Sequence, residues 1–232
     1  MNHGRHAQII PCHSPSHQPL LACSMTQANQ SVRPVAKTTH VLYLHGFRSS
    51  PKSTKAQQMA QCMATEFPHI TWWCPQLPPS PQAAARLILE GTADWPADRM
   101  AVVGSSLGGF YATWLAARRG CKAALLNPAI DPARDLAKYI GEQSTWHDPA
   151  ERFYFAPEFV DELRALEVGP MPHPERVWAL IAKGDEVLDW REMTARYPNS
   201  PQVVMEGGDH AISTFETYLP RVLEFLDLQA SA

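Results

Sequence analysis

The sequence lacks two features that would place it in large functional classes. It has no basic excess, because 20 Lys and Arg stand against 23 Asp and Glu, a formal net charge of −3. Without such an excess a chain is poorly suited to hold phosphate backbones, so we expect no nucleic-acid partner. No apolar run approaches the roughly 18 residues that a membrane span requires, so we expect no membrane partner either.

Cysteine is scarce, and its spacing is irregular. The five cysteines are Cys12, Cys23, Cys62, Cys74 and Cys121, with no Cys-x-x-Cys pair among them. An odd, unpatterned set argues against a disulfide framework and against a structural zinc site, so we expect no metal. Free thiols fit a reducing compartment, and the predicted location is cytoplasmic.

Residues 1–38 are poor in periodic apolar residues and rich in His, Ser, Pro, Gln and Asn. Such a segment buries too little apolar surface to offset the entropy lost on ordering, so it is predicted to be a disordered or extended tail. It has no apolar core of the length that a secretory signal needs. A true start at Met25 is an alternative explanation for the segment. Residues 39–232 are predicted to form one domain, since their number is suited to a single buried core.

Short apolar runs alternate with helical patterns from Thr39 onward. The predicted strands are 41–44, 70–74, 100–103, 123–126, 177–181 and 202–205, and the predicted helices are 53–66, 81–90, 106–117, 190–197 and 214–228. Strands that are apolar throughout suit a parallel sheet covered by helices on both faces. The sequence therefore predicts a doubly wound, mostly parallel α/β sheet of about six strands.

The stretch 130–176 breaks this alternation, with six prolines and a concentration of aromatic residues. Two interpretations remain: an insertion that caps the active site, which we favour, and an ordinary long connection containing one or two helices.

The motif Gly104-Ser105-Ser106-Leu107-Gly108 follows a predicted strand and precedes a predicted helix. In this setting it is typical of a nucleophile elbow, whose sharp turn exposes the central serine. Glycines two residues before and two after remove the Cβ atoms that would collide in the turn. Ser106 is the predicted nucleophile, and the backbone N–H of Leu107 is a predicted oxyanion donor.

A second oxyanion donor is expected from the loop after an earlier strand. His45-Gly46-Phe47-Arg48 occupies that place, and the Phe47 N–H is the candidate. His45 is interpreted as shaping this loop rather than as a base. Arg48 could contact a substrate carboxylate or phosphate, or could simply face solvent.

The acid and the base are expected, in that order, after later strands. Asp185 follows the strand 177–181, with Glu186 and Asp189 as alternatives. We favour Asp185, because Asp189 is well placed as the N-cap of the next helix. The predicted base is His210, after the strand 202–205. His69, His147 and His173 are alternatives that do not follow the end of a strand, and Asp209 is expected to face solvent or its turn.

Several segments together resemble the YqiA-type esterases of bacteria. They are Tyr-Leu-His-Gly-Phe at 43–47, Pro-Gln-Leu-Pro-Pro at 75–79, the elbow at 104–109, Asn-Pro-Ala at 127–129, Gly-Asp-Glu-Val-Leu-Asp at 184–189 and Glu-Gly-Gly-Asp-His-Ala at 206–211. The resemblance covers about residues 40–228. It implies an α/β-hydrolase acting on short acyl esters and on acyl-CoA thioesters, with Ser106, Asp185 and His210 in the catalytic roles. Asp209 departs from the usual Asn before the histidine, and 141–160 diverges from the family pattern.

The sequence thus predicts a serine carboxylic-ester hydrolase that works through an acyl-Ser106 intermediate and needs no cofactor. A thioesterase or an acyltransferase would use the same residues. A non-catalytic binding protein on a hydrolase fold is the alternative from another class, and the complete set of Ser, Asp and His argues against it. The expected partner is a small acyl ester or thioester.

Overall fold

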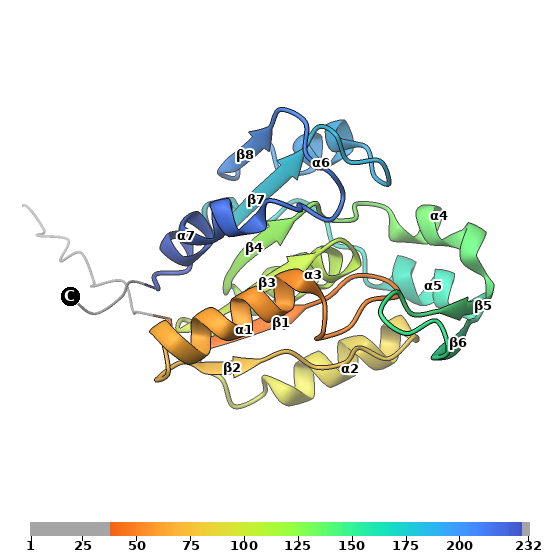
Figure 1. Cartoon of the computed structure of the whole chain (residues 1–232), viewed down its shortest axis with the longest axis horizontal. Helices are drawn as coiled ribbons and strands as arrows, with labels where there is room; N and C mark the ends of the chain where they lie inside the picture. The colour runs from red at the N-terminus through yellow and green to blue at the C-terminus, as the bar shows by residue number, and fades with distance from the viewer. Residues whose placement is uncertain (1–37, 229–232) are drawn as a thin grey trace, which may run out of the picture. The chain divides into compact units, whose positions relative to one another are not determined.

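A computed structural model describes residues 38–228 (Figure 1). The predicted tail lies outside this range apart from Thr38, as do Cys12 and Cys23. Cys62, Cys74 and Cys121 are free thiols. Among residues 38–228, no helix is both long enough and apolar enough to cross a membrane.

The core of the domain is a parallel sheet of six strands in the order β2-β1-β3-β4-β7-β8. The strands are β1 (His40–Leu44), β2 (Thr71–Trp73), β3 (Met100–Ser105), β4 (Lys122–Leu126), β7 (Val177–Ala182) and β8 (Gln202–Met205). β3 and β7 lie inside the sheet and are buried along their whole length. The doubly wound α/β sheet expected from the apolar runs is confirmed.

Helices cover both faces of this sheet (Figure 1). On one face lie α1 (Thr54–Glu66) and α7 (Phe215–Phe225), and on the other α2 (Pro81–Gly91), α3 (Leu107–Arg119) and α6 (Trp190–Arg196). Local sequence explains several helix ends. Ser80 accepts a hydrogen bond from the Ala83 amide at the start of α2, and α3 ends at Gly120, which has φ +66°.

The predicted elements agree with the structure to within about three residues at each end. One difference matters for chemistry. The pattern predicted a helix from residue 106, whereas α3 begins at Leu107 and Ser106 precedes it with φ +55° and ψ −120°.

Residues 130–176 form a small substructure between β4 and β7. It contains α4 (Pro132–Leu136), the 3₁₀ turn η1 (Ala137–Tyr139), the antiparallel hairpin of β5 (Gly141–Ser144) and β6 (Arg152–Phe155), α5 (Glu158–Ala165) and the 3₁₀ turn η2 (Pro174–Arg176). The hairpin was not predicted. Phe153 and Phe155 of β6 pack edge-on against Phe47, so the hairpin contacts the loop after β1.

Candidate active site

Ser106 lies at the sharp turn between β3 and α3. Its φ of +55° is a conformation that non-glycine residues rarely adopt, and the surrounding backbone holds it there. The Ser106 N–H donates to Leu126 O at 3.0 Å, and its carbonyl accepts from the amides of Gly109 at 2.8 Å and Ala129 at 3.0 Å. The turn is thereby fixed to the end of β4, and the side chain is displayed at the carboxyl edge of the sheet.

Two glycines make this turn sterically feasible. A Cβ on Gly108 would lie 1.9 Å from the Leu44 carbonyl oxygen, and one on Gly104 would lie 2.2 Å from the Gly108 carbonyl oxygen. Both distances are far below any real contact, and both obstacles are backbone atoms that cannot rotate away. The glycines that the motif singled out are therefore required by close packing at the elbow.

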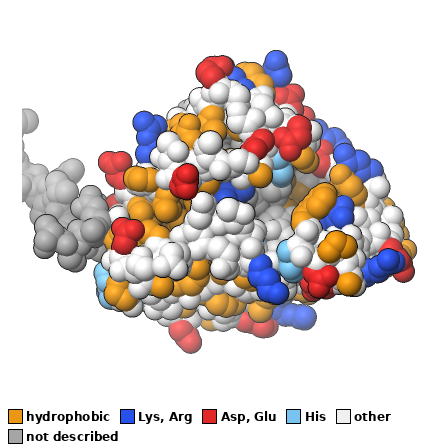
Figure 2. Space-filling view, viewed as in Figure 1, with side chains coloured by type: hydrophobic (Ala, Val, Ile, Leu, Met, Phe, Trp, Pro, Cys, Tyr) orange, Lys and Arg blue, Asp and Glu red, His pale blue; other side chains and the backbone are white. Residues whose placement is uncertain are grey.

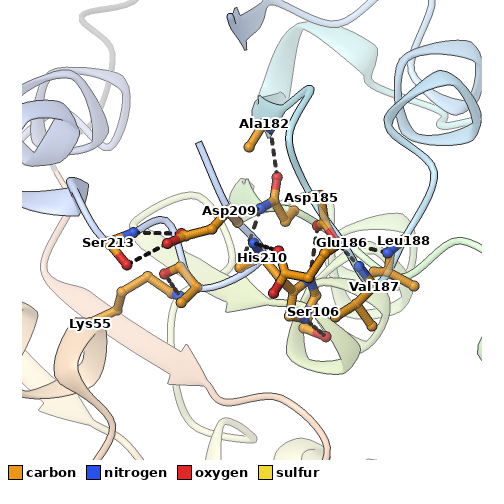
Figure 3. A network of polar contacts seen from close by, with 12 residues as sticks. Lys55, Ser106, Ala182, Asp185, Glu186, Val187, Leu188, Asp209, His210 and Ser213 are labelled. Carbon is orange, nitrogen blue, oxygen red and sulfur yellow. Dashed lines mark hydrogen bonds and ion pairs between the residues drawn. The ribbon is translucent and has the colours of Figure 1, made fainter. Parts of the chain in front are cut away.

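Three side chains from separate strand ends meet at this point (Figure 3). His210 Nε2 lies 3.0 Å from Ser106 Oγ, and His210 Nδ1 lies 2.8 Å from Asp185 Oδ2. Because a carboxylate only accepts, Nδ1 carries the proton and Nε2 is left to accept from the serine hydroxyl. The structure brings together the three residues that the sequence predicted as nucleophile, base and acid.

The Asp185 carboxylate is held in place by the loop that carries it. Its side chain is 0% exposed, and its Oδ1 accepts from the amides of Val187 and Leu188, each at 2.8 Å. The two alternatives for the acid have other partners. Asp189 caps α6 by accepting from the Arg191 amide at 2.9 Å, and Glu186 accepts from the backbone N–H of His210 at 2.9 Å.

Asn127 is a site residue whose role sequence reasoning missed. Its fully buried side chain donates from Nδ2 to the carbonyls of Asp209, at 3.0 Å, and His210, at 3.2 Å, and its Oδ1 accepts from the Ala182 amide at 2.8 Å. It thus joins the end of β7 to the loop that carries His210. Its position just past β4, at the same edge of the sheet as Ser106, was the signal that could have identified it.

The loop after β1 approaches the nucleophile closely. A Cβ on Gly46 would lie 3.1 Å from Ser106 Cβ and 3.5 Å from Ser106 Oγ. Within the described residues, neither the Phe47 N–H nor the Leu107 N–H donates a hydrogen bond to another protein group. Both predicted oxyanion donors therefore remain free to bind a ligand.

His45 has a structural place in this loop. Its Nε2 accepts from the Leu77 amide at 3.1 Å, so Nδ1 carries the proton and donates to Gly46 O at 3.0 Å. Burial lowers the pKa of His45, which keeps the ring neutral. The other candidate bases contact different groups: His147 pairs with Glu151, His173 pairs with Glu175, and the His69 ring lies edge-on to Phe67.

A cavity of about 640 Å³ opens onto Ser106 and His210. It is visible as a hollow on the face shown in Figure 2, with charged side chains of both signs around it. Tyr139 and Trp146, from the 130–176 segment, contribute to its wall. Arg48 also lines it, but its guanidinium donates to Ser144 O at 2.6 Å and stacks 4.0 Å above the Trp146 ring. Between residues 38 and 228, no cluster of three or more His, Cys, Asp or Glu could hold a metal.

Comparison with known proteins agrees with this architecture. Mouse alpha/beta hydrolase domain-containing protein 10 is similar over 82% of this chain and 91% of its own, with 16% identity and a TM-score of 0.63. Est1E from Butyrivibrio proteoclasticus matches 82% of this chain and 86% of its own, with 15% identity and a TM-score of 0.58. For the Pyrococcus furiosus esterase Pf2001 the shares are 84% and 82%, with 16% identity and a TM-score of 0.54.

At these identities the similarity establishes the fold, and the predicted α/β-hydrolase fold is confirmed. The sequence itself matches a family along most of its length, over residues 40–227, which confirms the relationship suggested by the motifs. The chain belongs to the Uncharacterised protein family UPF0227, the family of the YqiA-type proteins.

Proposed function

We propose that the protein is a serine carboxylic-ester hydrolase acting on short acyl esters, with Ser106, His210 and Asp185 as its catalytic residues. One observation carries the proposal: the continuous hydrogen-bonded chain from Ser106 Oγ through the His210 ring to the buried Asp185 carboxylate. A serine hydroxyl next to a neutral imidazole, itself oriented by a carboxylate, is the arrangement that activates an oxygen nucleophile.

In the first half-reaction, Ser106 Oγ attacks the ester carbonyl while His210 Nε2 takes the hydroxyl proton. The carbonyl oxygen becomes an oxyanion, and the free N–H groups of Phe47 and Leu107 are the groups proposed to bind it. When the tetrahedral intermediate collapses, the bond to the alkoxy oxygen breaks. His210 returns its proton to that oxygen, so an alcohol leaves and the acyl group stays on Ser106.

In the second half-reaction, His210 Nε2 takes a proton from water as the water oxygen attacks the acyl-Ser106 carbonyl. Collapse of this second intermediate breaks the bond to Ser106 Oγ, which recovers its proton from His210, and a carboxylic acid is released. Asp185 stays ionised throughout and stabilises the imidazolium that forms twice in the cycle.

Labelling with a fluorophosphonate probe tests the nucleophile directly. We expect the wild type to be labelled and Ser106→Ala to be unlabelled, and tandem mass spectrometry should place the adduct on Ser106 rather than on the adjacent Ser105. No labelling of the wild type, or equal labelling of the variant, would refute the proposal and would favour a binding protein on a hydrolase fold.

A substrate panel separates the reactions that share this machinery. Esters and CoA thioesters of matched acyl length distinguish an esterase from a thioesterase, and added alcohols or amines reveal transfer in place of hydrolysis. Est1E, which shares the fold, has been solved with ferulic acid bound, and this supports a small carboxylic acid as product. We expect 4-nitrophenyl butyrate to be hydrolysed and the activity to be lost in His210→Ala.

A further inference from the structure

Part of the lining of the active-site cavity is polar and has no role in the proposed triad chemistry. Tyr43, Ser53, Thr54 and Lys55 line the cavity together with Ser106 and His210. Tyr43 belongs to β1, whereas the other three stand at the start of α1. A substrate bound at Ser106 therefore shares its cavity with these groups.

Tyr43 supplies a donor without a partner. Its side chain is 0% exposed, and its Oη makes no hydrogen bond to any described residue. Burial raises the pKa of this phenol well above its ordinary value, and the neighbouring hydroxyls of Ser105 and Ser53 oppose the shift only in part. The phenol therefore keeps its proton. A buried, unsatisfied hydroxyl is costly, so its retention beside a cavity points to a ligand acceptor.

The start of α1 adds further unfilled donors. Ser53, the residue before the helix, makes no capping hydrogen bond. Within the described residues, the backbone amides of Thr54, Lys55 and Ala56 donate to no protein acceptor. A helix N-terminus carries partial positive charge, and free amides there favour an anion.

Lys55 supplies a full positive charge. Its ammonium donates to the carbonyl of Ala211, the residue after His210 (Figure 3). In the part of the chain that the structure describes, Lys55 forms no ion pair; the nearby carboxylates are Asp209, bonded to Ser213, and Asp185, bonded to His210. Burial lowers the pKa of Lys55 to about 8, and these two carboxylates oppose the shift. The ammonium thus has carboxylates nearby but none in direct contact, and it keeps donors that a ligand can accept.

We infer that Tyr43, Lys55 and the start of α1 form an anion subsite, and that the enzyme prefers esters carrying a carboxylate or phosphate a few atoms from the scissile bond. This inference rests on the proposed function, because the subsite shares its cavity with Ser106 and His210. Because Lys55 contacts Ala211, the residue after His210, we expect the anion to lie beside the loop that carries the catalytic histidine.

The other cations of the cavity are less suited to this role. Arg48 is engaged by Ser144 and by the Trp146 ring. Lys138 lies on the exposed η1 turn, where water screens its charge. Lys55 combines partial burial, unused donors and contact with the loop that carries His210.

The test compares kcat/KM for pairs of esters in which one member carries an anionic group and the other carries a neutral group at the same place. 4-Nitrophenyl hydrogen glutarate against 4-nitrophenyl pentanoate places the carboxylate on the acyl side. A second pair, the butyrate esters of glycolic acid and of glycolamide, places the carboxylate on the alcohol side. A third pair, 2-(butyryloxy)ethyl phosphate and 2-methoxyethyl butyrate, places a phosphate on the alcohol side. In the wild type we expect at least one anionic member to be preferred roughly 10- to 100-fold, the factor expected for a charged hydrogen bond.

The variants Lys55→Met and Tyr43→Phe are then measured on the preferred pair. We expect the anionic-to-neutral ratio to fall at least tenfold in Lys55→Met and by a smaller factor in Tyr43→Phe, which removes one hydroxyl and keeps the ring. Lys52→Met is the matched control, because Lys52 is exposed and lies outside the cavity. A variant that only disturbs the His210 loop would slow both members of a pair and leave the ratio unchanged.

No preference for an anion on any pair, or a preference that survives both variants, would overturn the inference. If fluorophosphonate labels Ser106 and the neutral esters are hydrolysed, such a result rejects the anion subsite alone. If Ser106 is not labelled and the neutral esters are not hydrolysed, the proposed function itself is rejected, and the anion subsite with it.

Discussion

Replacing Asn127 by alanine should weaken the packing between the loops that carry the active site, while leaving the three catalytic side chains unchanged. Three hydrogen bonds are lost, two to the carbonyls of Asp209 and His210 and one from the Ala182 amide. Because the side chain is completely buried, these partners are left without a replacement. At about 1 kcal/mol for each bond, the loss of stability is about 3 kcal/mol.

Backbone conformation adds to this effect. Asn127 has φ +42°, where alanine is disfavoured by about 1 kcal/mol and asparagine less so. The sum of about 4 kcal/mol should lower Tm by roughly 10 °C in a domain of this size. Asn127→Gly loses the same hydrogen bonds without a Cβ at positive φ, so it isolates the side-chain contribution.

Thermal unfolding followed by circular dichroism measures the effect, and the rate of fluorophosphonate labelling reports on the position of His210. We expect Asn127→Ala to lose both stability and labelling rate. Asn199→Ala, at an exposed turn without side-chain hydrogen bonds, serves as the control and should leave Tm within a degree or two. A Tm for Asn127→Ala equal to that of the control would show that the strand ends are held together by something else.

Further expectations concern the acid, the elbow and the cation of the cavity. Asp185→Asn should lower kcat for 4-nitrophenyl butyrate by about 10⁴, whereas Asp189→Asn, which keeps a helix-capping side chain, should not; equal losses would contradict the assignment of the acid. Gly108→Ala should abolish folding, seen as loss of the cooperative thermal transition, because its Cβ would meet Leu44 O at 1.9 Å; a normal transition would contradict this reasoning. The anionic-to-neutral ratio of kcat/KM should be constant well below the Lys55 pKa of about 8 and fall as pH rises through it, since the charged form is lost. Changes that slow both substrates equally cancel in the ratio, so a flat profile to pH 9.5 would exclude Lys55 as the cation.

The strands and the elbow could be predicted because their signals are local. Each sheet strand is an apolar run that ends near Gly, Pro or Asn, and the chain order of Ser, Asp and His follows from the strand ends on which they stand. The β5–β6 hairpin gave no such signal. Gly141–Ser144 has no apolar alternation, and the hairpin depends on Phe153 and Phe155 packing against Phe47, about a hundred residues earlier.

The roles of Asn127 and Lys55 were hidden for a related reason. Asn127 contacts residues 55 to 83 positions away, and Lys55 contacts Ala211 across 156 positions. One sequence without its fold does not show which of several polar residues near strand ends will meet. The position of a residue at the carboxyl edge of the sheet reduces the number of candidates. Which of these candidates contact one another depends on how the loops pack together.

The order of strands in the sheet has a consequence for how the active site comes into being. Ser106 and His210 are separated by 104 residues, and they meet only when β7 has paired with β4 and β8 has paired with β7. Parallel pairing of this kind requires long crossovers and closes slowly. After dilution from denaturant, helical signal should therefore recover before reactivity toward a serine probe. The rate at which labelling returns then measures the rate at which the last strand docks. Reactivity toward the probe therefore reports the completion of folding in this protein.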